Sequence, residues 1–139
     1  MSGRARFVVV SAAILGILFP VLETLRRGFG AWLHTPATML QDYVAGGLLL
    51  AAVVAVLAGW RLGWPTMLAA CAYATGMMSS SFWSQLEAQM TGVTWEANQV
   101  LVVAVKSLLW GFPLVMTVLS AMIVASQTRA ASLGAGARA

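Results

Sequence analysis

Polar residues recur every three or four positions along the last apolar segment of the sequence, and they are the first candidates for chemistry. The recurring residues are Glu96, Gln99, Lys106, Trp110, Pro113, Thr117 and Ser120. At about 100° per residue, these positions fall within about a third of the circumference of a helix. Most of the other positions are Val, Leu, Met or Ala. The spacing therefore predicts a helix with one polar face along nearly its whole length.

Lys106 is the charged residue that lies well inside an apolar run, roughly 9 Å from the outer end of the predicted span. Placing a lysine within a membrane costs about 3 kcal/mol, so such a residue is by default a candidate for function. Glu23 and Asp42 are its nearest predicted partners by depth. Two interpretations remain open. The side chain extends to the headgroups or forms a structural ion pair, or it binds an anionic substrate or relays protons.

A second group of polar residues is predicted at the outer ends of the helices. It comprises Glu23, Arg26, Arg27, His34, Asp42, Gln85, Glu87, Glu96, Asn98 and Gln99. Any membrane protein has a solvated polar rim at this level. The functional alternative is a vestibule for a cation or a polar solute, with Glu23 and Asp42 as gate charges and two arginines that weaken the negative field.

Residues for metal or covalent chemistry are scarce. His34 is the single histidine and Cys71 the single cysteine, which excludes a bis-histidine haem, a cysteine-based metal cluster and an intrachain disulfide. No histidine accompanies the serines 79–81, and no phosphate loop or dinucleotide fingerprint is present. We therefore predict no catalytic residues, no metal and no cofactor.

Composition places these residues in a membrane protein. Of the 139 residues, 60% are apolar and only 9% are charged, and the mean hydropathy is +0.87, whereas about 25% of the residues in soluble domains are charged. The net charge of +4 comes from single or paired Lys and Arg beside apolar segments. This placement suits lipid headgroups rather than nucleic acid, so we expect the lipid bilayer as a partner and no nucleic acid.

The apolar runs predict an all-α bundle of four transmembrane helices in one domain, residues 1–128. The predicted spans are residues 7–25, 40–60, 65–83 and 99–125, and residues 129–139 are predicted to form a disordered tail. Gly28 and Gly30 should end the first helix, and Thr35 with Pro36 should start the second. Glu23, Arg26 and Arg27 stand where a signal-peptide cleavage site would need small residues, so we expect an uncleaved anchor.

Small residues on the second and third spans predict that these two helices pack closely as a hairpin. They are Ala45, Gly46, Ala55, Ala58 and Gly59 on one helix and Ala69, Ala70, Ala72, Ala74 and Gly76 on the other. Pro20 and Pro113 predict kinks within the first and fourth helices.

Charge asymmetry predicts the orientation. One side of the membrane would hold Arg4, Arg6, Arg61, Arg129 and Arg138 without any acid, and the other would hold all four acids with Arg26 and Arg27. The positive-inside rule then places both termini in the cytoplasm. We expect a bacterial inner membrane.

Two main functional hypotheses follow. The first is a non-catalytic accessory subunit of a membrane complex, or a homo-oligomer, that associates with other membrane chains through its small-residue helix faces. The second is a small transporter or channel with a solute path along the polar face of the last span. Its candidate binding or gating residues are Lys106, Glu23, Asp42, Glu96, Gln99 and Trp110. A lipid-modifying or redox membrane enzyme is a third hypothesis.

Overall fold

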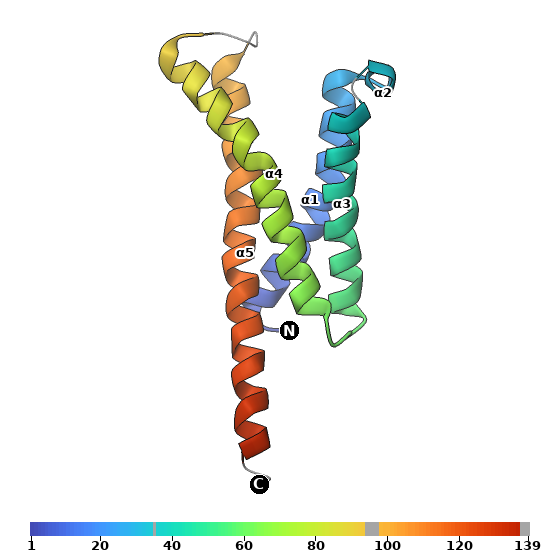
Figure 1. Cartoon of the computed structure of the whole chain (residues 1–139), viewed down its shortest axis with the longest axis vertical. Helices are drawn as coiled ribbons and strands as arrows, with labels where there is room; N and C mark the ends of the chain where they lie inside the picture. Colours follow the sequence, from blue (N-terminus) through green and yellow to red (C-terminus); the bar gives the residue numbers. More distant parts are fainter. Residues whose placement is uncertain (35, 94–97, 137–139) are drawn as a thin grey trace.

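The computed structural model describes residues 1–34, 36–93 and 98–136, and over these ranges the chain forms helices and no strands. The elements are α1 (Gly3–Arg27), α2 (Ala31–His34), α3 (Pro36–Leu57), α4 (Gly63–Thr91) and α5 (Gln99–Gly136). The four long helices run alternately up and down (Figure 1). The prediction of an all-helical chain is confirmed.

Three of the helices are long and apolar enough to cross a membrane, namely Gly3–Arg27, Met39–Leu57 and Gln99–Leu133. They correspond to the first, second and fourth predicted spans. The third predicted span lies within α4, which is not among them because Tyr73, Thr75 and the serines 79–81 lower its hydropathy.

Local signals set most of the helix ends. The Ser2 side chain accepts a hydrogen bond from the Ala5 backbone N–H at 3.3 Å and caps α1. Gly28 ends this helix at φ +75°, a conformation that favours glycine. Pro36 is the first residue of α3, as predicted, whereas its predicted cap, Thr35, lies outside the described residues. Pro20 and Pro113 lie within the continuous helices α1 and α5.

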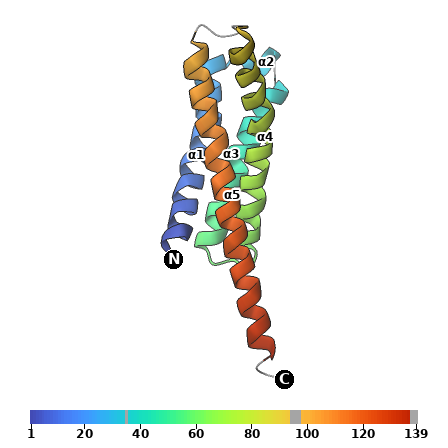
Figure 2. The same cartoon turned by 90° about the vertical axis from the view of Figure 1, so that its left-hand side faces the viewer.

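Two helices are longer than predicted. α4 continues to Thr91, where Gly92 ends it in the left-handed conformation, because the polar residues 84–91 contain neither Gly nor Pro. α5 continues to Gly136, over most of the segment predicted to be a disordered tail, because alanine-rich sequence has a high helix propensity. This lower part of α5 extends beyond the other helices (Figure 2).

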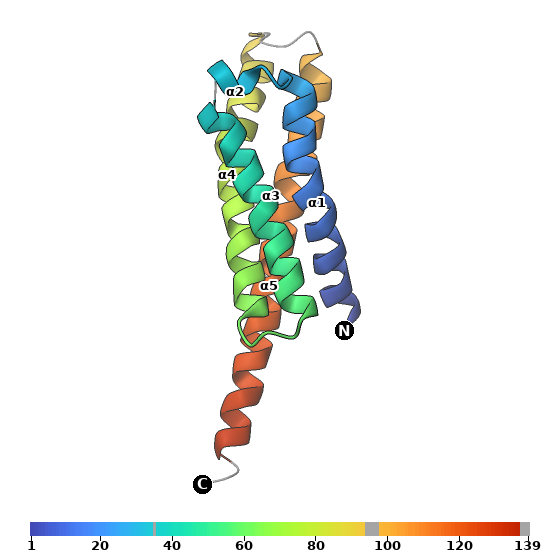
Figure 3. The ribbon, with the colours of Figure 1, turned by 90° about the vertical axis from the view of Figure 1, so that its right-hand side faces the viewer.

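The helices form two pairs, α1 with α3 and α4 with α5. The pairs meet where α3 packs on the lower half of α4 and where α1 contacts α5, and they diverge toward the upper end (Figure 1). The N-terminus and the turn between α3 and α4 lie at the same, lower end (Figure 3). The core at this end contains the fully buried side chains of Val8, Leu49, Met67, Cys71 and Met116.

Small residues allow these contacts. α3 and α4 pack on each other as the predicted hairpin, and Ala45, Ala55, Ala70 and Ala74 are buried. Gly46, however, faces α1: a Cβ atom at this position would lie 2.5 Å from the Gly16 carbonyl oxygen. Gly46 therefore lets the backbone of α3 approach α1 closely, whereas the prediction placed this glycine against α4.

Candidate functional site

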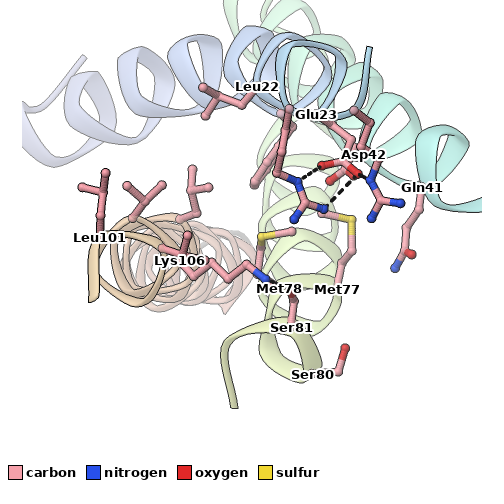
Figure 4. A pocket seen from close by; sticks show the side chains of 16 residues that line it. Leu22, Glu23, Gln41, Asp42, Met77, Met78, Ser80, Ser81, Leu101 and Lys106 are labelled. Carbon is pink, nitrogen blue, oxygen red and sulfur yellow. Dashed lines mark hydrogen bonds and ion pairs between the residues drawn. The ribbon is translucent and has the colours of Figure 1, made fainter. Parts of the chain in front are cut away.

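The divergence of the two helix pairs leaves a cleft of about 370 Å³ at their upper half, and all four long helices contribute to its walls. Among the described residues, its polar and charged lining consists of Glu23, Arg26, Arg27, Gln41, Asp42, Ser80, Ser81 and Lys106. The deeper lining is apolar and includes Phe19, Met77 and Leu109. Figure 4 shows the charged side chains converging from α1, α3 and α5.

Glu23 is held by two arginines of the same helix. Arg26 donates from Nε to Glu23 Oε2 at 3.2 Å and from Nη2 to Oε1 at 3.4 Å. Arg27 forms an ion pair with Oε1. Residues three and four positions apart lie on one face of a helix. In α1 this face lines the mouth of the cleft. Both carboxylate oxygens of Glu23 are therefore engaged within α1.

Lys106 extends from α5 across to α4, where its Nζ donates a hydrogen bond to Ser81 Oγ at 2.8 Å (Figure 4). The side chain is half-buried and lines the cleft. The ammonium therefore contacts a hydroxyl group of α4 inside the bundle, a position compatible with both a structural and a functional role. Ser81 was not predicted as a partner. The sequence could have indicated this contact, because Ser81 and Lys106 lie at similar numbers of residues from the α4–α5 connection and so at similar heights on two antiparallel helices.

Asp42 lies on α3 beside Glu23, on the side of the cleft opposite Lys106 (Figure 4), and is 9% exposed. It is within Coulombic range of Glu23, Arg26, Arg27 and Lys106. The structure thus brings together Lys106, Glu23 and Asp42, three of the predicted site residues. It also adds the two arginines, which the sequence alone placed only on the outer rim.

The other predicted site residues lie elsewhere. Gln99 is buried and donates to Gln85 Oε1 at 2.7 Å and to the Gln85 carbonyl at 3.2 Å. The Trp110 ring stacks on Phe82 with 4.8 Å between ring centroids and 3° between planes. Neither residue lines the cleft. Glu96 lies outside the described residues.

The polar face of α5 is directed at α4 along much of its length. Below Lys106, the Thr117 and Thr75 hydroxyls are hydrogen-bonded at 3.2 Å, and Ser120 is fully buried. Hydroxyl and amide groups of this kind hold membrane helices together. Among the described residues of this polar face, Lys106 lines the cleft, at the level where α1 and α3 diverge from α4 and α5.

No three His, Cys, Asp or Glu side chains gather in a metal-binding arrangement among the described residues. The cleft instead offers ammonium, guanidinium, carboxylate and hydroxyl groups, which bind a charged or polar ligand through ion pairs and hydrogen bonds. Comparison of the chain with protein-family models, curated proteins and solved structures gives no match.

Proposed function

We propose that this chain is a bundle of four transmembrane helices in a bacterial inner membrane, with both termini in the cytoplasm. The 29 residues of α4 extend for about 43 Å, enough to cross a hydrocarbon core of about 30 Å. Its polar side chains have partners on α5: Ser81 with Lys106, Thr75 with Thr117 and Gln85 with Gln99. These pairings would let a helix of modest hydropathy cross the membrane inside a bundle.

Cysteine labelling in intact cells tests this topology. Cys71 is fully buried, so the unmodified chain should not react with a membrane-impermeant maleimide. Met90→Cys, at an exposed position near the end of α4, should react from outside the cell. Leu62→Cys, in the exposed turn between α3 and α4, should react only after the membrane is permeabilised. Labelling of both variants in intact cells would contradict a membrane crossing by α4.

The function that we propose is the binding of an anionic small molecule in the cleft, as in a small transporter. The observation that carries this proposal is the gathering of five ionisable side chains around the cleft, counted over the part of the chain that the structure describes. Three of these side chains are cationic, Arg26, Arg27 and Lys106, and two are acidic, Glu23 and Asp42. Ionisable groups within the membrane are costly, and they mark substrate or ion pathways.

The position of the cleft suits a binding site with one open side. Below it, Leu49, Met67 and Met116 are fully buried and fill the space between the helix pairs. A ligand would enter from the outer end or from the lipid, as it would in the outward-open state of a transporter. The predicted solute path along α5 would therefore begin at Lys106, and passage further down would require α4 and α5 to separate from α1 and α3.

Thermal unfolding of the purified protein in detergent tests ligand binding. A ligand that binds the folded state raises the unfolding temperature. We expect one or more of sodium acetate, phosphate and octanoate to raise the temperature at constant ionic strength, and octylammonium chloride to have no effect. Lys106→Met should reduce the shift at the same ligand concentration. If no anion shifts the wild-type protein, or if the shift is undiminished in Lys106→Met, the proposed function is wrong.

A second candidate is an accessory subunit of a membrane complex or a homo-oligomer, and the lower part of α5 favours it. This segment extends beyond the other helices (Figure 3), and Arg129 and Leu133 are exposed along it. An isolated helix of this length is only marginally stable in water, so contact with another chain would stabilise it.

Pull-downs in mild detergent test this second candidate. We expect one dominant partner, or a second copy of this chain, and we expect truncation after Gln127 to remove that association. A full-length chain that purifies alone and monomeric would rule this candidate out.

A further inference from the structure

A second cavity, about 340 Å³ in volume, lies between α1 and α5. We call it the α1–α5 groove. Its lining is almost entirely apolar and includes Ile14, Leu18, Leu108 and Phe112. Leu22, Val105 and Leu109 line both the groove and the charged cleft, so the two cavities are neighbours that share a wall or an opening. Together they offer charged groups at one end and hydrocarbon at the other.

The groove opens sideways, at the outward-facing surface formed by α1 and α5. Ile14 is 52% exposed and Leu108 is 61% exposed. In a membrane, these side chains face lipid. A molecule dissolved in the bilayer could therefore enter the groove sideways without leaving hydrocarbon.

The accessible charge at the cleft mouth is positive. Side-chain exposure is 44% for Arg26 and 29% for Arg27, but only 11% for Glu23, and Asp42 is 9% exposed. Glu23 is moreover engaged by both arginines. A ligand head that arrives at the mouth would meet guanidinium groups first and the Lys106 ammonium deeper in the cleft.

From this juxtaposition we propose that the ligand is a single-chain anionic amphiphile of the fatty-acid type. Its carboxylate binds between Lys106 and the two arginines, and its hydrocarbon chain lies in the α1–α5 groove. This inference rests on the proposed function and specifies its ligand. A single acyl chain is the simpler occupant of one groove between two helices, so we assign one chain rather than the two of a phospholipid.

The head and the tail contribute differently to binding. Moving a hydrocarbon chain from lipid into an apolar groove removes no apolar surface from water, so the tail gains little free energy. The carboxylate gains charge-assisted hydrogen bonds in a site of low dielectric constant. The head group should therefore decide affinity, and the groove should decide where the tail lies.

Photocrosslinking in phosphatidylcholine nanodiscs tests the position of the tail. The probe is a fatty acid with a diazirine near the end of its chain, and peptide mass spectrometry locates the adducts. We expect adducts on Ile14, Leu18 and Phe112. Excess palmitate should reduce them, whereas hexadecanol and hexadecylammonium at the same mole fraction should not. In Lys106→Met, groove adducts should fall about tenfold, a change that corresponds to about 1.4 kcal/mol of binding free energy.

Val10 and Val118 serve as matched control positions. They are 56% and 54% exposed and lie on α1 and α5 but line neither cavity. Labelling of these residues as strong as that of the groove would overturn the proposal, because it would show general contact with lipid. Phosphatidylglycerol that displaces the probe better than palmitate would overturn the assignment to a single chain.

The two proposals fail in different ways. If an anion raises the unfolding temperature through Lys106 but the groove is not labelled selectively, the amphiphile assignment is wrong and anion binding stands. If neither effect is found, both are wrong.

Discussion

Gly46→Leu is expected to destabilise the bundle by about 3 kcal/mol, at the upper end of the cost of overpacking a core. A Cβ atom at position 46 would lie 2.5 Å from the Gly16 carbonyl oxygen and 2.9 Å from Pro20 Cδ. The first neighbour is backbone and the second belongs to a rigid ring, so neither moves aside as a flexible side chain would. The variant therefore folds only if α1 and α3 separate, which also moves Glu23 away from Asp42 on the same side of the cleft.

Gly47→Leu is the matched control for this prediction. It makes the same change one residue away on α3, and nothing lies within 4 Å of a Cβ atom there. Because leucine favours a helix over glycine by roughly 0.5–1 kcal/mol, this variant should be as stable as the wild-type protein or slightly more so. Unfolding in mixed micelles with rising SDS content measures both. Equal stability of the two variants would show that α1 and α3 do not make this contact.

Helix ends and apolar spans were largely predictable, because both depend on nearby residues. Gly28 ends α1 and Pro36 begins α3 for local conformational reasons. The change to polar composition after residue 83 predicts an end of α4 that is too early. A helix can continue past its apolar segment until a residue such as Gly92 stops it.

The candidate site was predictable only in part. Depth in the membrane follows from position along a helix, so Lys106, Glu23 and Asp42 could be placed at one level and do line one cleft. Which neighbour each face of α5 meets depends on how all the helices pack, and sequence periodicity carries no such information. The polar face consequently predicted Gln99 and Trp110 as site residues, whereas the first bonds to Gln85 and the second stacks on Phe82, both on α4.

Lys106→Glu is expected to reverse the ligand charge that the cleft prefers. In the wild-type cleft, three cationic side chains face two acids, and the substitution leaves two cations and three acids. Octanoate should lose at least about tenfold in affinity, because a charge-assisted hydrogen bond contributes about 1.5–3 kcal/mol and is replaced by repulsion. Octylammonium, which has the same chain length, should gain affinity. Thermal shifts measured with both amphiphiles report the reversal within one protein preparation.

Two controls separate this effect from misfolding and from net charge. Lys106→Arg keeps the cation and should retain the preference for octanoate. Arg129→Glu changes the net charge of the chain as much as Lys106→Glu does, but it lies at an exposed position on the lower part of α5 and should leave the preference unchanged. The fully buried Cys71 should remain unreactive toward maleimide in every folded variant. A folded Lys106→Glu protein that still binds octanoate as the wild-type protein does would place the anion outside the cleft, since a carboxylate at this position repels any anion held within hydrogen-bonding distance.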